Sequence, residues 1–287
     1  MYDVLVVGGG PAGISAAVYL QRFKLKVIVI AKDYGALGQT THIENYYGFE
    51  APITGKQLVE SGFAQARRLG VEVNVGEEVL AINGSEPFIV KTNIKEYHAK
   101  VVLLATGMSR PSLRVKGFTT LQGKGISFCG ICDGFLYRNK RIGLVGSGDF
   151  MLEELDVLKN FSKNITIFTH GEPLKVDVKE FAVITEPIIE LLGPETLTGL
   201  KTSNHQYELD ALFIAAGTPS ASDFAMRMGA FVNPKNEIEV SPTFSTNIPG
   251  LYAAGDCTGG LLQISKAVRD GAEASLAINK YLKTKTS

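Results

Sequence analysis

The chain has 287 residues, enough for one large domain or two of ordinary size. Its 45% hydrophobic and 20% charged residues are typical of a soluble globular protein, and its apolar runs are too short to cross a membrane. A formal net charge of zero gives no sign of a nucleic-acid or membrane-surface partner.

The N-terminus has the pattern that opens a dinucleotide-binding fold: a strand, a glycine-rich turn, a helix and a second strand. We expect these elements at residues 2–7, 14–21 and 26–30, with the turn Gly8-Gly9-Gly10-Pro11-Ala12-Gly13 after the first strand. The glycines permit a tight turn, close approach of a pyrophosphate, and packing of the helix on the strand. The free N–H groups at the helix start would then face the phosphates.

One part of this motif is missing. The second strand ends in Ile30-Ala31, where an acidic residue usually binds the adenosine ribose, and Asp33 comes slightly late. The ribose must therefore be held in another way, or Asp33 must reach back to it.

A weak internal repeat predicts a second fold of the same kind. Strands expected at residues 101–104 and 212–214 each run into a small-residue turn, Ala105-Thr106-Gly107 and Ala215-Ala216-Gly217. A strand at 141–145 enters another glycine turn, followed by a helix at 153–161 and a strand at 165–168. We therefore predict an α/β protein of two nested Rossmann-like, three-layer domains, the second inserted in the first. The expected boundaries are 1–111 with 241–287 for the outer domain and 112–240 for the inserted one.

The remaining predicted elements lie toward the C-terminus. Gly193-Pro194 and Asn204-His205-Gln206 are typical of hairpin turns in an antiparallel segment. Residues 264–282 have apolar residues at helical spacing, and Leu276 is expected on the buried face.

Cys129-Gly130-Ile131-Cys132 lies between the two folds. A pair with this spacing is half of a zinc site, a structural disulfide or a redox centre. The other cysteine, Cys257, and the four histidines are scattered singly, so we expect no metal site, and Cys257 is expected to be a packed residue. A disulfide that closes so small a loop stabilises little, which favours redox chemistry through a mixed disulfide.

Asp133 follows the second cysteine directly. A carboxylate there is placed to exchange protons with a departing thiolate or a reduced flavin. Asp is also favoured as the N-cap of a helix, and both roles stay open.

A second cofactor signal lies near the C-terminus, in Ala253-Ala254-Gly255-Asp256. An acidic residue after a tight small-residue turn suits a ribityl hydroxyl and the pyrophosphate region of a flavin. Gln263-Ile264 follows, where N–H groups at a helix start would meet the flavin ring. Together with the first glycine turn, this implies FAD.

These motifs together resemble those of the low-molecular-weight thioredoxin reductases over nearly the whole chain. The resemblance implies a homodimer with FAD in the outer domain, a disulfide between Cys129 and Cys132 with Cys132 nearer the flavin, and Asp133 as the proton-handling acid. A cytoplasmic location is also expected, because the N-terminus lacks a signal-peptide pattern. The motifs and the resemblance give these cofactor contacts: Gly8, Gly10, Pro11, Ala12, Gly13, Gln39, Asn45, Thr106, Gly107, Gly255, Asp256, Gln263 and Ile264.

The second glycine turn departs from that family. Met151 stands where its NADPH site needs glycine or alanine, and a methionine would push the helix from the strand or block the pyrophosphate. The stretch 169–175 has no arginine for a 2′-phosphate, and Glu172 would repel one. The inserted domain is also short for the family.

These losses narrow the resemblance to the ferredoxin-dependent flavin thioredoxin reductases of anaerobic bacteria. We predict a disulfide oxidoreductase in which reduced ferredoxin supplies electrons through FAD to Cys129–Cys132 and on to thioredoxin. The alternatives are an NADPH-dependent thioredoxin reductase with a divergent nucleotide site, a diflavin disulfide oxidoreductase, and a non-catalytic flavin redox sensor. A ferredoxin–NADP reductase-like enzyme is a further class, against which the dithiol argues.

Overall fold

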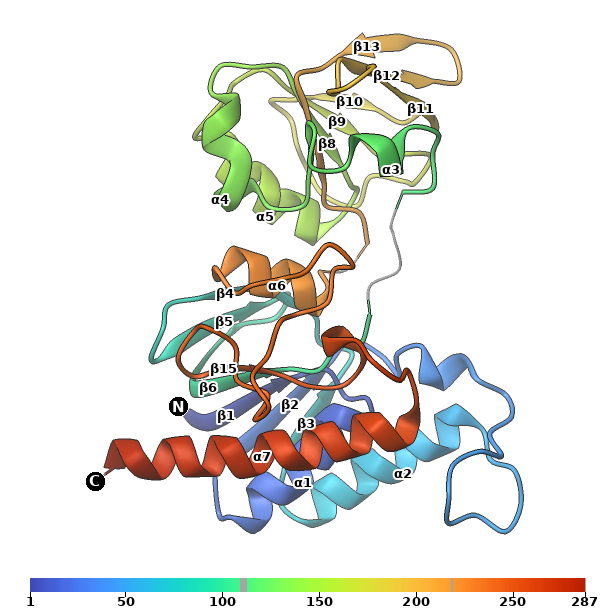
Figure 1. Cartoon of the computed structure of the whole chain (residues 1–287). Coiled ribbons are helices and arrows are strands. Elements are labelled where there is room, and N and C mark those ends of the chain that lie inside the picture. Colours follow the sequence, from blue (N-terminus) through green and yellow to red (C-terminus); the bar gives the residue numbers. More distant parts are fainter. Residues whose placement is uncertain (109–112, 218, 287) are drawn as a thin grey trace. The chain divides into compact units, whose positions relative to one another are not determined.

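The computed structural model describes residues 1–108, 113–217 and 219–286, and the chain separates into two compact units (Figure 1). Unit 1 comprises Met1–Ser109 and Ser220–Ser287, and unit 2 comprises Arg110–Pro219. Unit 2 is thus inserted within unit 1, and the prediction of an α/β protein with nested Rossmann-like domains is confirmed.

The boundaries differ in part from those expected. The expected boundary at 111/112 lies outside the described residues. At the other boundary, the chain returns to unit 1 at Ser220 rather than near Ser241. The cause is α6 (Ala221–Arg227), which packs beside β4 and buries Phe224 in a core cluster of unit 1.

The sheet of unit 1 has the strand order β3-β2-β1-β6-β5-β4, and β15 pairs with β6. Its strands are β1 (Tyr2–Val7), β2 (Val27–Ala31), β3 (Glu72–Val75), β4 (Val79–Asn83), β5 (Phe88–Thr92), β6 (Glu96–Leu104) and β15 (Leu251–Ala253). β3, β2, β1, β6 and β15 pair in parallel, whereas β4, β5 and β6 pair antiparallel. The strand order reverses between β1 and β6, which is where open α/β sheets bind ligands.

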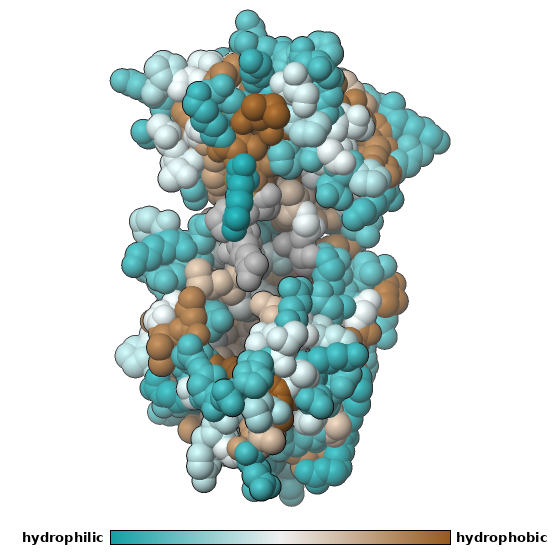
Figure 2. Space-filling model, turned by 90° about the vertical axis from the view of Figure 1, so that its right-hand side faces the viewer, coloured by the Kyte–Doolittle hydropathy of each residue, from teal (hydrophilic) through white to brown (hydrophobic). Residues whose placement is uncertain are grey.

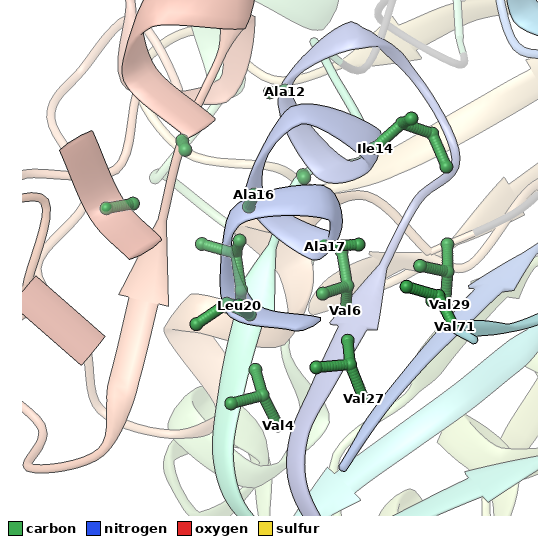
Figure 3. Packing of buried hydrophobic residues seen from close by; sticks show 14 of the residues in the cluster. Val4, Val6, Ala12, Ile14, Ala16, Ala17, Leu20, Val27, Val29 and Val71 are labelled. Atoms are coloured by element: carbon green, nitrogen blue, oxygen red, sulfur yellow. The ribbon is translucent and has the colours of Figure 1, made fainter. Parts of the chain in front are cut away.

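Both faces of this sheet are covered. On β1, Val4 and Val6 belong to one buried cluster, and Leu5 and Val7 belong to the other, as alternation along a strand requires. The first cluster packs under α1 (Pro11–Arg22), whose buried residue Leu20 lies over β1 in Figure 3. Helices α2 (Gly55–Arg68) and α7 (Ile264–Thr286) lie against α1.

α7 confirms the predicted C-terminal helix but not all of its buried face. Leu276 is 53% exposed, so the expectation for that residue was wrong, whereas Ala274 and Ile278 are fully buried. Within the described residues, no helix is both long and apolar enough to span a bilayer. On the face shown in Figure 2, apolar residues form small groups among hydrophilic ones.

Unit 2 has a parallel sheet and a small antiparallel one. The parallel order is β10-β9-β8-β14-β7, and the antiparallel order is β11-β12-β13. The strands are β7 (Ile126–Ser127), β8 (Ile142–Val145), β9 (Ile165–Phe168), β10 (Ala182–Ile184), β11 (Ile188–Leu192), β12 (Gly199–Thr202), β13 (Gln206–Glu208) and β14 (Ala211–Ile214). The connections between β11, β12 and β13 contain the two turns predicted from the sequence, which confirms the antiparallel segment.

The described part of unit 2 also contains the short α-helices α3 (Phe118–Leu121), α4 (Gly130–Asp133) and α5 (Asp149–Leu158). α5 begins directly after the second glycine turn, earlier than the helix expected at 153–161, because Gly148 serves as its N-cap. α4 carries the second cysteine of the Cys-x-x-Cys motif and is followed by η2 (Gly134–Tyr137).

Candidate active site

The carboxyl ends of three parallel strands bring the predicted residues of unit 1 together. Val7 pairs with Leu104, which in turn pairs with Ala253, so the turns after β1, β6 and β15 lie side by side. Gly8 has a φ of +110°, and a Cβ there would lie 2.4 Å from the Ala105 carbonyl oxygen. Only glycine allows this approach. Thr106 and Gly107 continue the turn after β6.

The first glycine turn packs tightly against the protein at Gly13 and faces open space at Gly10. A Cβ on Gly13 would lie 2.0 Å from the Gly8 carbonyl oxygen, so helix and strand touch there. A Cβ on Gly10 would meet no atom within 4 Å. Gly10 is the N-cap of α1, without a side-chain cap, and Pro11 begins the helix. A helix start with open space in front of it suits the pyrophosphate of a dinucleotide.

The turn after β15 reaches the same helix start. Gly255 has a φ of +87°, and a Cβ there would lie 2.8 Å from the Ala12 Cβ. Asp256 follows and begins η3 (Asp256–Thr258). Burial raises the pKa of the Asp256 carboxyl, an effect that the nearby Lys266 ammonium opposes. The backbone just before Asp256 therefore lies against the start of α1.

Two predicted flavin contacts far apart in sequence meet in the structure. The Asn45 side-chain amide donates a hydrogen bond of 2.9 Å to the Gln263 Oε1. Both side chains are exposed, and Ile264 follows as the first residue of α7. Gln39 is also exposed, at the end of η1 (Leu37–Gln39). The Asn45 and Gln263 amides thus place hydrogen-bond donors and acceptors just before the start of α7.

Asp33 does not reach back toward the glycine turn with its Oδ1. That oxygen accepts a hydrogen bond of 2.7 Å from the Gly35 N–H and so closes a local turn. Of the two possibilities left by the sequence, the structure favours a ribose held by other groups.

In unit 2, Cys129 and Cys132 form a disulfide, as the family resemblance implies. Cys129 is buried, with 2% exposure, whereas Cys132 is exposed. Cys129 is also the N-cap of α4, where its Sγ accepts a hydrogen bond of 3.2 Å from the Cys132 N–H. The start of a helix thus lies at the sulfur pair, a location that stabilises a thiolate.

Two carboxyl groups lie beside the disulfide. The Ser127 hydroxyl donates to the Asp133 Oδ2 at 2.7 Å, and the same hydroxyl accepts the Cys129 N–H at 3.1 Å. Asp133 therefore uses its side chain toward β7. It stands at the N-cap position of η2 but makes no side-chain cap hydrogen bond there, so the structure does not support the N-cap alternative. Sequence reasoning missed Glu154, which is 1% exposed and accepts the Gly130 N–H at 2.8 Å.

Cys257 is a packed residue, as expected. Its side chain is 2% exposed, and its thiol donates to the Ala254 carbonyl oxygen at 3.3 Å. Burial raises the pKa of this thiol to about 12, so it stays protonated and unreactive near neutral pH.

Two groups pack against the second glycine turn. Met151 is fully buried, and its Cβ lies 2.6 Å from where a Cβ on Gly146 would be. On the other side, the Lys175 N–H donates a hydrogen bond of 2.7 Å to the Ser147 carbonyl oxygen. His170, in the stretch where a basic cluster would bind a 2′-phosphate, instead accepts the Ile188 N–H at 2.9 Å through its Nδ1. Side chains and backbone groups of unit 2 thus contact this turn and the segment that would bind a 2′-phosphate.

A dinucleotide fold with an open glycine turn, and a second such fold that carries a dithiol–disulfide pair, together define a nucleotide-linked disulfide oxidoreductase. The chain belongs to the pyridine nucleotide-disulphide oxidoreductase family, which matches residues 2–271, and within it to the thioredoxin reductases. The resemblance predicted from the motifs is thereby confirmed.

Known relatives match nearly the whole chain. The thioredoxin reductase of Bacillus subtilis (strain 168) is 32% identical over 305 residues, covering 98% of this chain and 95% of the relative. Among solved structures, the atypical thioredoxin reductase TRi of Desulfovibrio vulgaris Hildenborough has a TM-score of 0.90 and 34% identity, over 99% of both chains. A ferredoxin-flavin thioredoxin reductase of Clostridium acetobutylicum has a TM-score of 0.70 and 28% identity, over 99% and 98%.

Proposed function

We propose that this thioredoxin reductase takes its electrons from reduced ferredoxin rather than from NADPH. FAD is its cofactor, and we assign it to unit 1. The Cys129–Cys132 disulfide of unit 2 receives the electrons and passes them to thioredoxin. Unit 2 is then a degenerate NAD(P)-binding domain that retains the redox chemistry and not the nucleotide.

One observation carries the choice of donor. The second glycine turn has Met151 packed against Gly146 on the inside and the Lys175 backbone bonded to Ser147 on the outside. Met151 takes the position of the third small residue, which lets helix and strand approach in a pyrophosphate-binding turn, and the Lys175 segment is bonded to the turn at Ser147. The ferredoxin-flavin thioredoxin reductase among the structural neighbours supports the same choice of donor.

Each group of unit 1 has a proposed task toward FAD. The turn from Gly8 to Gly13 binds the pyrophosphate, and Thr106 and Gly107 border it. Asp256 accepts a hydrogen bond from a ribityl hydroxyl, while Asn45, Gln263 and the N–H groups at Ile264 orient the ring, with Gln39 nearby. FAD, when bound, accepts single electrons and delivers them in pairs, which suits a one-electron donor.

In unit 2, reduction breaks the S–S bond and takes up two electrons and two protons. Cys132 is the exposed sulfur, which supports its role as the one that meets the flavin. Asp133, hydrogen-bonded to Ser127, is the proposed proton donor to the departing thiolate. The resulting dithiol reduces thioredoxin by exchange through a mixed disulfide.

The family resemblance supports a homodimer. We also propose a cytoplasmic location, where thiols are kept reduced.

Turnover of thioredoxin by the purified protein tests this function. When ferredoxin is kept reduced by an added reductant, we expect steady reduction of thioredoxin. We also expect the purified protein to contain one FAD per chain. Equal turnover with NADPH would restore the divergent-site alternative, and two flavins per chain would favour the diflavin enzyme. Reduction of the flavin without any turnover of thioredoxin would indicate a redox sensor.

A further inference from the structure

A nearly buried ammonium group lies behind the turn that carries Asp256. The Lys266 Nζ, on the first turn of α7, donates to the carbonyl oxygens of Gly255 at 2.8 Å and Gly259 at 2.6 Å. It also contacts the Thr258 hydroxyl at 3.2 Å. All three contacts lie within the segment 255–259, which we call the Asp256 loop.

A buried carboxylate completes the arrangement. The Asp270 Oδ2 lies 2.8 Å from the Lys266 Nζ, and their side chains are 1% and 16% exposed. The same oxygen accepts the Gly255 N–H at 3.3 Å. The Asp256 loop is therefore held at its carbonyls by a cation and at one amide by the counter-ion of that cation.

The loop needs such a restraint because its backbone is unusual. Gly255 and Gly259 have φ angles of +87° and +74°, and glycine gives up more conformational freedom on folding than other residues. Its position also has to be accurate, since Gly255 approaches Ala12 at the start of α1. A shift of the loop would move Asp256 relative to the glycine turn.

Stability alone is a poor explanation for this pair. Taking two charges out of water costs free energy that their attraction repays only with good geometry and further hydrogen bonds. Here the further hydrogen bonds of Lys266 go to the loop beside the cofactor site. The buried ion pair is therefore better explained by the hydrogen bonds through which Lys266 holds that loop in place.

We propose that Lys266 is a positioning residue for FAD, which holds the Asp256 loop against α1 so that its carboxylate meets the cofactor. This inference rests on the proposed assignment of FAD to unit 1. The residue does not touch the cofactor in this account but acts through Gly255, Thr258 and Gly259.

The test is the rate at which the holoprotein releases FAD after dilution, followed by the rise in flavin fluorescence. For Lys266→Met we expect release about tenfold faster than wild type, which corresponds to about 1.4 kcal/mol of binding free energy when the association rate is unchanged. Lys280→Met is the matched control, because Lys280 is an exposed lysine of the same helix. It should release FAD at the wild-type rate.

A double variant separates positioning from simple pairing of charges. Lys266→Met leaves Asp270 buried without its ammonium, and Lys266→Met/Asp270→Asn removes that charge while keeping an acceptor for the Gly255 N–H. Thermal unfolding of the double variant should return toward wild type, whereas FAD release should stay fast. If FAD release also returned to the wild-type rate, Lys266 would only neutralise Asp270 and the proposal would be wrong.

Unchanged FAD release in Lys266→Met, whatever its thermal stability, would likewise overturn the proposal. A wild-type protein purified without FAD, and unable to take it up, would instead contradict the proposed function itself.

Discussion

The two glycine turns of this protein share a local structure and differ in what surrounds them. Each follows a parallel strand and leads into a helix whose N-cap is a glycine without a side-chain cap, Gly10 in unit 1 and Gly148 in unit 2. A Cβ at either N-cap would meet no atom within 4 Å. The two turns differ at the third position of the motif, where a small residue is usual. This residue is Gly13 in the first turn and Met151 in the second.

The comparison shows that a nucleotide site depends on both sides of the turn. In unit 1, Gly13 brings the helix onto the strand, and the turn faces open space. In unit 2, Met151 fills the inside, and the segment after β9 bonds to Ser147 from the outside.

The largest effect is expected when the disulfide of unit 2 is removed. Cys132→Ser should lower thioredoxin turnover by on the order of a thousandfold or more, because no mixed disulfide can be resolved. The flavin should remain bound and reducible. Stopped-flow and steady-state assays check both, and turnover near the wild-type rate would contradict the assigned redox centre.

Substitution at the two N-cap glycines compares the turns directly. Gly10→Val should weaken FAD binding by about a hundredfold, since a pyrophosphate loses close contact with the backbone. Gly148→Val should leave thioredoxin turnover within about twofold of wild type, because no pyrophosphate binds there. FAD content and turnover of both variants are the measurements. A severe loss of turnover in Gly148→Val would show that a nucleotide does use the second turn.

Met151 should behave as a core residue and not as a removable obstacle. Met151→Ala is expected to cost about 2–5 kcal/mol of unfolding free energy, as for other large buried side chains. Denaturant unfolding followed by circular dichroism measures this cost. NADPH binding gained by Met151→Ala, with little loss of stability, would mean that Met151 alone closes the site.

The smallest effect is expected at Cys257, the one cysteine of unit 1. With the pKa of its thiol raised to about 12, its thiolate fraction rises only as pH approaches that value. At pH 8 this fraction is on the order of one in ten thousand, so alkylation of the folded protein should be negligible. Mass spectrometry of the reduced, alkylated protein should therefore show two labels, on Cys129 and Cys132. Rapid labelling of Cys257 would place it outside the packed core.

Local patterns in the sequence predicted much of this structure. The elements around Gly8 to Gly13 and the disulfide of the cysteine pair follow from spacing and family motifs. The hydrogen bond between Asn45 and Gln263, each predicted only as a flavin contact, became visible in the structure. Leu276 was misplaced because helical periodicity alone does not tell which face a neighbouring helix covers. The return to unit 1 at Ser220 was missed because α6 is short and its docking is a tertiary effect.

Charged groups were the hardest part to predict. The spacing of Lys266 and Asp270 suits an ion pair on one helix face, which is usually exposed. Their burial against the Asp256 loop depends on the turn after β15, which lies outside the helix. For the same reason, nothing in Glu153-Glu154 indicates that Glu154 would be the buried residue that bonds to Gly130.

The choice of electron donor is tested most directly by anaerobic bleaching of the flavin in the purified holoprotein. We expect NADPH at micromolar concentration to leave the visible absorbance of the flavin unchanged. Reduced ferredoxin, generated in the same cuvette, should bleach it fully and then support reduction of thioredoxin. Rapid and complete bleaching by NADPH would contradict the proposed donor, because it would require a nucleotide to bind at the turn against which Met151 and the Lys175 segment pack.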